Sequence, residues 1–267
     1  MVLAFSEDLQ TGLSLRISRY PDQGVTWVWC HAISRGRFLA YSDSHLSCGP
    51  AHNEADAGSA DYGAPDIGLR MHRDGASADL HGIRFGGTFL AHASHEAPEG
   101  PGDVRLSLSG EFRPDKQAAG ALPGRYEQTG QVILEMETDG ETTLYRGLGK
   151  AHEQTQTTPR FGPAFTYVML WGPDSSLIGL SAGGRGRGEF IAPDGRTAVE
   201  SLDIGPRGTQ RRLEAKLAGG GKLAVAATSA HAFTVPVFGR RWCGSMVSAD
   251  VGGRPMVGMI NDWPGLG

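Results

Sequence analysis

Apolar and polar residues alternate along most of this chain with a period of about two, which favours β-strands over helices. In the first half, the alternating or apolar segments are residues 13–19, 25–33, 38–43, 67–72, 78–83, 88–92, 104–112, 124–137 and 143–147. In the second half they are residues 165–171, 177–181, 188–192, 198–204, 212–217 and 222–228. No segment has the sustained period and the caps of a long helix. We therefore predict an all-β protein of short antiparallel strands.

Turn-forming residues separate these segments. They include Pro21-Asp-Gln-Gly, Ser34-Arg-Gly-Arg, Arg73-Asp-Gly, Thr138-Asp-Gly and Gly172-Pro-Asp-Ser. Residues 53–66 contain Ala, Asp, Gly and Ser without periodicity, so we expect a long loop there. The Gly- and Ala-containing link after residue 112 has room for one helical turn.

The two halves of the chain resemble one another. Residues 27–33 and 38–42 have counterparts at residues 167–171 and 177–181, and Gly124-Arg-Tyr and Gly239-Arg-Arg-Trp each open a closing hairpin. A duplicated unit is one explanation, and the similarity that any two β-meanders share by chance is the other. We predict an N-terminal lipocalin-like β domain at residues 1–150 and a C-terminal one at residues 151–267.

Closing each half into a barrel or half-barrel removes its exposed strand edges. The fold prediction is therefore two tandem lipocalin-like antiparallel β-barrels. A barrel of this size can hold one small ligand, and a cleft between two barrels is the other natural site. We expect the ligand pocket between or within the barrels.

The composition is consistent with the predicted barrels and limits the kinds of binding partner to expect. The chain has 267 residues, 39% of them hydrophobic, which is enough for one large core or two smaller ones. Its 40 glycines and 15 prolines are spread between apolar runs, as tight turns require. The net charge is −4, with 25 basic and 29 acidic residues intermixed. No basic field is present for a phosphate backbone, so we expect no nucleic-acid partner.

The N-terminal apolar run, residues 1–5, is too short for a signal peptide, and no later run could span a membrane. We expect a cytoplasmic protein without membrane insertion, and the sequence is compatible with a homodimer. Cys30, Cys48 and Cys243 form no C-x-x-C pair, which favours reduced thiols.

The densest group of ionisable residues is Asp43, His45, Cys48, His52 and Glu54. These residue types can bind zinc, but their spacing matches no common zinc pattern, so we predict no metal. A histidine beside a carboxylate can exchange a proton near neutral pH, which makes His45 and His52 candidate catalytic residues and Asp43 a candidate substrate contact. The alternative is an ordinary solvated loop.

A second candidate site follows the strand that contains Gly147 and Gly149, where a backbone or a ligand can approach closely. Adjacent strand residues face opposite sides, so only one of His152 and Glu153 can face a given pocket. We favour His152 as the catalytic residue and Gln154 as a substrate contact. The alternative is a linker histidine bonded to backbone.

Aromatic residues on the predicted strands form the third candidate group. Most pack in cores, but aromatic faces also stabilise a developing carbocation. Glu127, beside an aromatic residue, is a further candidate acid. The candidate aromatic substrate contacts are Trp29, Tyr126, Tyr167, Trp171 and Trp242.

Three further sequence features argue against phosphate binding, serine hydrolase chemistry and a catalytic Cys–His pair. The glycine- and arginine-rich residues 183–188 lack the Lys-Ser/Thr of a phosphate-binding loop and lie between strands, so a hairpin is favoured. A Gly-x-Ser-x-Gly elbow is absent, which leaves serine hydrolase chemistry without support. Cys30 and His31 are adjacent on a strand, where they face opposite sides and cannot form a thiolate–imidazole pair.

Two tandem lipocalin-like barrels, with Gly147-x-Gly149 and His152 at the end of the first, resemble a group of known proteins. This group contains the carotenoid 1,2-hydratases (hydroxyneurosporene synthases), the AttH-like proteins and the fungal lipocalin-like Diels–Alderases. Members often carry Gly-x-Gly-x-x-Asp-His-Ser-Trp-Gly at this junction. Here Ala151 and the residues after His152 supply neither the acid nor Ser-Trp-Gly, and Glu153 is the nearby substitute.

The resemblance covers nearly the whole chain and implies a cofactor-free enzyme for an isoprenoid- or polyketide-like substrate. We therefore expect a lyase or isomerase of secondary metabolism that needs no cofactor and acts on a hydrophobic small molecule. Hydratase, double-bond isomerase and cyclase activities remain open. The alternatives are a non-catalytic carrier of a lipid or isoprenoid and a structural interaction module.

Overall fold

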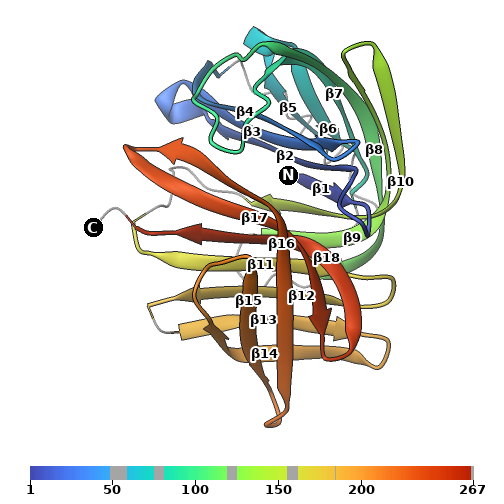
Figure 1. The fold of residues 1–267 in the computed structure, drawn as a ribbon, viewed down its shortest axis with the longest axis vertical. Coiled ribbons are helices and arrows are strands. Elements are labelled where there is room, and N and C mark those ends of the chain that lie inside the picture. The colour runs from blue at the N-terminus through green and yellow to red at the C-terminus, as the bar shows by residue number, and fades with distance from the viewer. Residues whose placement is uncertain (49–58, 75–80, 119–124, 155–161, 184, 266–267) are drawn as a thin grey trace. The chain divides into compact units, whose positions relative to one another are not determined.

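The computed structural model describes residues 1–48, 59–74, 81–118, 125–154, 162–183 and 185–265. Within these ranges the chain forms strands and two short 3-10 helices, and no helix is long and apolar enough to cross a membrane. The strands divide into two compact units, β1 to β10 and β11 to β18 (Figure 1). The predicted all-β fold with two antiparallel barrels is confirmed.

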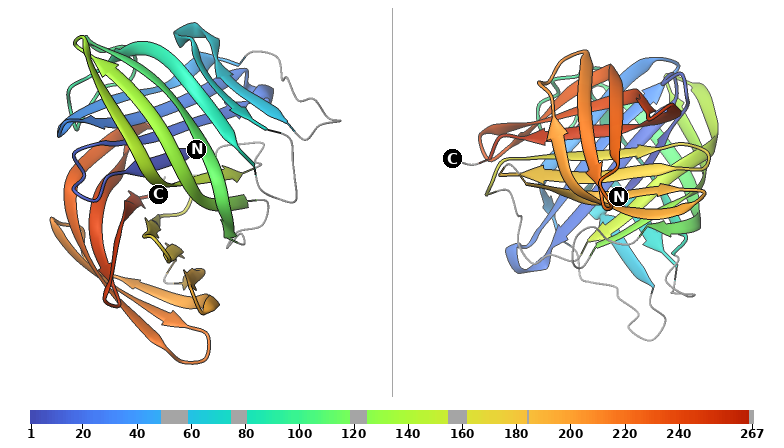
Figure 2. Two further views of the ribbon diagram at one scale, coloured as in Figure 1. Left: turned by 90° about the vertical axis from the view of Figure 1, so that its right-hand side faces the viewer. Right: turned by 90° about the horizontal axis from the view of Figure 1, so that it is seen from below.

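The first unit is one 10-stranded antiparallel sheet in the order β4-β3-β2-β1-β10-β9-β8-β7-β6-β5. Its strands β8 to β10, green to yellow-green in Figure 2, curve together along one side. The elements are β1 (Val2–Phe5), β2 (Gly12–Tyr20), η1 (Pro21–Gln23), β3 (Val25–Ser34), β4 (Arg37–Ser47), β5 (Ala60–Ala64), η2 (Pro65–Ile67), β6 (Leu69–Arg73), β7 (Ile83–Ala91), β8 (Val104–Ala118), β9 (Arg125–Thr138) and β10 (Glu141–Gln154).

This sheet curls until it is a nearly closed barrel. The outer edge of β4 meets the segment that follows β7, where Ala40 and His92 exchange two backbone hydrogen bonds of 2.8 Å. The amide of Gly100 donates to the carbonyl oxygen of Ser42 at 2.8 Å. These bonds satisfy part of the strand edge that an open sheet would expose.

The second unit is a closed eight-stranded barrel in which the last strand, β18, pairs with the first, β11. All neighbouring strands are antiparallel and follow the order of the chain. The strands are β11 (Phe165–Trp171), β12 (Ser176–Ala182), β13 (Arg185–Ala192), β14 (Gly195–Ile204), β15 (Gln210–Leu217), β16 (Lys222–Val237), β17 (Arg240–Val251) and β18 (Arg254–Trp263).

Alternation along the strands builds each core as the sequence predicts. On β9 the side chains of Val132, Leu134 and Met136 are buried in the core of the first unit, while the intervening Ile133 and Glu135 are exposed. Successive strand residues point to opposite faces, so this pattern fixes which face of β9 is inside. The second barrel has its own core, which includes Val168, Leu170 and Val225.

Glycine at position 149 allows β1 to lie close to β10. A Cβ atom added there would come within 2.6 Å of the carbonyl oxygen of Leu3, closer than real Cβ contacts allow. The expectation that this glycine admits a close backbone is confirmed. Because β1 joins β2 to β10, Gly149 permits the strand pairing that makes the first unit one continuous sheet.

Two turns of the first unit share one local design. Pro21-Asp-Gln-Gly and Pro65-Asp-Ile-Gly each form a 3-10 turn with proline at the first position and a left-handed glycine, Gly24 at φ 68° and Gly68 at φ 64°. Proline fixes a φ near that of the turn, and glycine takes the positive φ without strain. The first turn was predicted from sequence.

Several local predictions need correction. The expected loop at residues 53–66 is wrong for its described part, which contains β5 and the start of η2. The helical turn after residue 112 is wrong as far as Ala118, because β8 continues to that residue. Half of the predicted strand at residues 78–83 lies outside the described residues, and in the described half β7 begins only at Ile83.

The structure has hairpins at both ends that the sequence comparison matched, β9–β10 and β17–β18, while the internal repeat itself stays a prediction. In each unit the last strand pairs with the first, β10 with β1 and β18 with β11. The counterpart of β11 is therefore β1 by position, whereas the sequence comparison had matched β11 to β3. The predicted domain boundary at residue 150 falls within β10, which pairs with β9 as far as Gln154.

Candidate functional site

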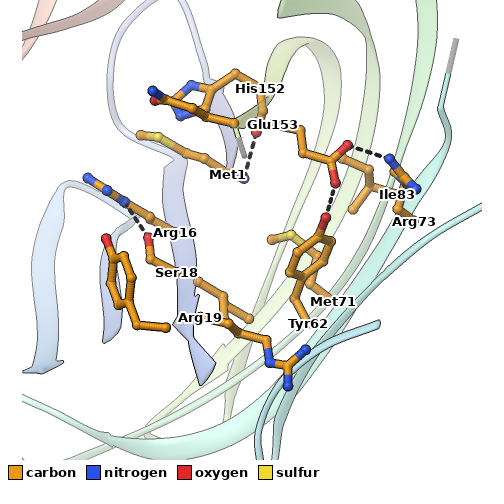
Figure 3. Close-up of a pocket in the computed structure, with 13 residues that line it drawn as sticks. Met1, Arg16, Ser18, Arg19, Tyr62, Met71, Arg73, Ile83, His152 and Glu153 are labelled. Atoms are coloured by element: carbon orange, nitrogen blue, oxygen red, sulfur yellow. Dashed lines mark hydrogen bonds and ion pairs between the residues drawn. The ribbon is translucent and has the colours of Figure 1, made fainter. Parts of the chain in front are cut away.

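A pocket of about 110 Å³ lies in the first unit, beside the start of β1 (Figure 3). The ladder of β1 ends where Val2 pairs with Leu15 of β2 and with Ala151 of β10. Both neighbouring strands continue past that point. The pocket is lined by Met1, Arg16, Ile17, Ser18, Arg19, Tyr20, Tyr62, Met71, Arg73, Ile83, His152, Glu153 and Gln154.

Alternation brings side chains from both faces of the sheet to this pocket. Ile17 belongs to the core of the barrel, so Arg19 lies on the same inner face and Arg16 on the outer one. On β10, Ala151 belongs to the core, which places Glu153 on the inner face and His152 on the outer face. Side chains from the inner and the outer face of the sheet therefore both line the pocket.

Glu153 is the acidic side chain of the pocket. Its carboxylate accepts hydrogen bonds from the phenol of Tyr62 and from Arg73, whose Nη1 lies 2.7 Å from Oε2. Figure 3 shows the carboxylate directed toward both partners. Only 20% of the Glu153 side chain is exposed, and burial raises the pKa of its carboxyl group, with the nearby amino terminus acting in the opposite direction. The group keeps its proton to a higher pH than an exposed glutamic acid.

His152 contacts the same pocket from the other face. Nη2 of Arg125 lies 3.0 Å from its Nδ1. Arginine can only donate, so Nδ1 accepts and the proton of the neutral ring is on Nε2. Burial lowers the pKa of His152 well below its usual value, and the positive charge of Arg125 lowers it further. His152 can thus donate a hydrogen bond from Nε2 while remaining neutral.

We predict that His152 stays in the neutral Nε2–H form at pH values where an exposed histidine would be protonated, because a proton on Nδ1 would face the guanidinium of Arg125. Ring ¹⁵N chemical shifts measured across a pH titration test this. Arg125→Gln should raise the pKa of His152, whereas Arg113→Gln, which removes an exposed arginine of β8, should leave it unchanged. Protonation of His152 near pH 6.5 in the unmodified protein would contradict the prediction.

Glu127 is almost fully buried, with 1% of its side chain exposed, and is not among the described residues that line the pocket. It forms ion pairs with Arg125 and with Lys150, whose Nζ lies 2.7 Å from Oε2. Gln154, which does line the pocket, accepts a hydrogen bond of 3.5 Å from Arg125. Arg125 contacts both Glu127 and His152. Glu127 is therefore connected to the pocket indirectly, through Arg125.

The aromatic candidates of the first unit have different environments. Trp29 is buried on the outer face of β3, and the guanidinium carbon of Arg16 lies 4.6 Å from the centre of its ring. Trp29 is not among the described residues that line the pocket, but it contacts Arg16, which is. Tyr126 is 42% exposed and packs edge-on against His81, with ring centroids 5.9 Å apart. It is not among the pocket-lining residues.

Asp43 and His45, from the ionisable cluster that the sequence analysis singled out, lie on β4 and not among the lining residues of the pocket. The His45 side chain is 79% exposed and lies 3.9 Å from Asp43 and 3.8 Å from Glu99, and the backbone amide of His45 donates to Asp43 at 2.8 Å. His52 lies outside the described residues. Neither His45 nor Asp43 lines the pocket, and over the part of the chain that the structure describes no metal-binding cluster of His, Cys, Asp or Glu is found.

Tyr167, Trp171 and Trp242 belong to the second unit. On β11, Val168 and Leu170 face the barrel core, so Tyr167 and Trp171 are buried on the outer face. Trp242 of β17 packs against Phe165 and Trp263, with ring centroids 5.4 and 6.1 Å away. None of these three aromatics is among the residues that line the described pocket.

The crystal structure of CghA matches this chain with a TM-score of 0.56 and 10% sequence identity, over 99% of this chain and 87% of that chain. The chain has the fold of the tandem lipocalin-like proteins. Kievitone hydratase from Nectria haematococca matches with a TM-score of 0.49 and 10% identity, over 98% of this chain and 87% of that chain. No protein-family model and no curated protein sequence matches it significantly. At this identity the likeness concerns the fold alone.

The pocket also contains residues that the sequence did not single out. Tyr62 comes from β5, Arg73 from β6, and Arg16 and Arg19 from β2. Glu153 was weighed against His152 as the residue that faces the pocket and noted as a substitute for a missing acid, but His152 was favoured. The alternation through Ala151 indicates that Glu153 faces inward, but only if the strand continues past residue 150. That continuation was the signal that sequence reasoning missed.

Proposed function

We propose that the protein is an acid–base enzyme that acts on an apolar small molecule without a cofactor. The observation that supports this is the partly desolvated carboxyl group of Glu153, held by Tyr62 and Arg73 inside a pocket. Carboxyl groups in such surroundings serve as proton donors because they remain protonated closer to neutral pH. The class of reaction is a hydration or dehydration, a double-bond shift or a cyclisation.

In the proposed chemistry Glu153 transfers its proton to the substrate and becomes a carboxylate, which Arg73 and Tyr62 stabilise. In a double-bond shift the substrate then loses a proton from a neighbouring carbon. In a hydration it gains water, which releases a proton. In both cases the released proton returns to Glu153. His152 would donate a hydrogen bond from Nε2 to an oxygen atom of the substrate.

The pocket volume restricts how a substrate can bind. About 110 Å³ is less than the roughly 150 Å³ of a cavity that holds benzene. An isoprenoid or polyketide would therefore place one end group in this pocket. Ile17, Met71 and Ile83 provide apolar contacts beside the polar groups.

A test is to incubate the protein with terpenoid, carotenoid and polyketide pools in deuterated water and to analyse the mixtures by liquid chromatography and mass spectrometry. We expect an isomer that carries deuterium from the solvent, or a product one water heavier or lighter. The non-catalytic carrier is the second candidate, which the apolar part of the pocket favours. Ligand retention without product or deuterium exchange would support the carrier and reject the enzyme.

A further inference from the structure

Each oxygen of the Glu153 carboxyl group has its own hydrogen-bond partner in the pocket. Oε1 contacts the hydroxyl group of Tyr62, and Oε2 lies 2.7 Å from Nη1 of Arg73 (Figure 3). The two partners differ in their hydrogen-bonding capacity. An arginine only donates hydrogen bonds, whereas a tyrosine hydroxyl group can both donate and accept. The two carboxyl oxygens are therefore not equivalent when Glu153 carries a proton.

The position of the acid proton follows from this difference. Oε2 receives a hydrogen from Arg73, so a proton on Oε2 would face a second donor. The proton of the acid form therefore belongs on Oε1, the oxygen that contacts Tyr62. There the carboxyl O–H donates to the Tyr62 oxygen, and Tyr62 no longer donates to Glu153. The hydroxyl hydrogen of Tyr62 can then be directed to another acceptor.

The surroundings of Tyr62 place its side chain in the pocket. Tyr62 of β5 is paired with Met71 of β6, and paired residues of neighbouring strands share a face of the sheet. Met71 belongs to the core of the first unit, and the ring of Tyr62 packs against that core. Both residues line the pocket together with Glu153. A ligand in this pocket can therefore contact Tyr62 as well as Glu153.

We propose that Tyr62 delivers the proton to the substrate and that Glu153 replaces it through their hydrogen bond, as a two-step proton relay. The inference rests on the proposed function and deepens it by naming the atom that contacts the substrate. The Oη–H bond of Tyr62 breaks as the substrate gains that hydrogen, and the Oε1–H bond of Glu153 breaks as its proton moves to Oη. Tyr62 is neutral before and after. Glu153 becomes the carboxylate that Arg73 and Tyr62 stabilise, and the proton that the substrate releases returns by the same path.

The kinetic test is Tyr62→Phe with the substrate found in the pool experiment. The relay needs the hydroxyl group, so the turnover number should fall by roughly 10²-fold while KM changes by less than about threefold. Turnover of the unmodified protein in mixtures of light and heavy water is the second readout. Two protons that move together predict a curved dependence on the deuterium fraction, and a single proton predicts a straight line.

Tyr145→Phe is the matched control. It removes another tyrosine hydroxyl group of the same unit, one that donates to the carbonyl oxygen of Leu148 and does not belong to a residue that lines the pocket. Its turnover number and its deuterium dependence should equal those of the unmodified protein. Circular dichroism checks that both variants are folded, and the heavy-water measurement tests the relay even if Tyr62→Phe fails to fold.

Infrared spectroscopy tests the same hydrogen bond without a substrate. The C=O stretching band of protonated Glu153 is the carboxyl band that Glu153→Gln removes. Tyr62→Phe should shift this band, because the carboxyl O–H loses its acceptor, and Tyr145→Phe should leave it in place.

An unmoved band in Tyr62→Phe would overturn the relay, as would full turnover in this variant or a straight deuterium dependence in the unmodified protein. The two proposals fail in different ways. If Glu153→Gln is inactive and Tyr62→Phe is fully active, Glu153 is the direct donor and only the relay is rejected. If no substrate in the pools is converted, the enzyme is rejected and the relay with it, whatever the band shows.

Discussion

Glu153→Gln should lower the turnover number by roughly 10²- to 10⁴-fold, the range that a positioned general acid contributes. Glutamine keeps the size of the side chain and can still accept a hydrogen bond from Tyr62, but it has no proton to transfer. Steady-state kinetics on the substrate found in the pool experiment measure the effect. Circular dichroism and denaturant unfolding should show that the fold is retained.

The matched control is Glu111→Gln, which removes an exposed carboxylate of β8 that pairs with Arg113, and its turnover should be unchanged. The pH profile gives a second readout. The folded-state pKa of Glu153 is raised, so the acid form dominates below that pKa and turnover should fall as the pH rises through it. Normal turnover in Glu153→Gln would remove this residue from the role of acid and return attention to His152.

The alternation of apolar and polar residues was enough to predict an all-β fold. It did not identify β1, the short first strand. All four residues of β1 are buried, so the strand has no polar face and no alternation to detect. A short apolar run of this kind cannot be assigned from periodicity alone. Yet β1 joins β2 to β10 and so links β2–β4 and β5–β10 into one sheet.

A usable signal was overlooked at the turn before β6. Pro65-Asp-Ile-Gly repeats the spacing of Pro21-Asp-Gln-Gly, which was correctly predicted as a turn between strands. The same reading would have placed a strand on each side of it and shortened the expected loop. The intervening residues suggested a loop because Ala, Asp and Gly disfavour strands on average. In β5 the pairing with β6 outweighs that preference.

The pocket could be inferred from sequence only in part. His152, Glu153 and Gln154 of β10 were singled out from the sequence. Most of the other lining residues come from β2, β5 and β6, distant segments that the curled sheet brings together. Local patterns do not contain that information. The choice between His152 and Glu153 depended on strand register, and the structure places both among the residues that line the pocket, beside the point where the ladder of β1 ends. Whether His45, His52 or Glu127 takes part in catalysis stays a prediction.

Glu127→Gln should reduce the free energy of unfolding by roughly 3 to 5 kcal/mol, as expected when one partner of a buried ion pair is removed. Only 1% of the Glu127 side chain and none of the Lys150 side chain is exposed. The substitution removes the carboxylate that both Lys150 and Arg125 contact, while the two positive charges stay in a poorly hydrated site. Urea denaturation followed by tryptophan fluorescence measures the loss.

The matched control is Glu200→Gln, because Glu200 pairs with Lys216 at 3.6 Å on the surface and both side chains are about half exposed. Its unfolding midpoint should be nearly unchanged. Adding Lys150→Met to Glu127→Gln should recover part of the lost stability by removing one buried charge. If Glu127→Gln is as stable as the control, the ion pair does not stabilise the barrel. If it is stable but inactive, Glu127 acts in catalysis, since a structural role predicts loss of stability first.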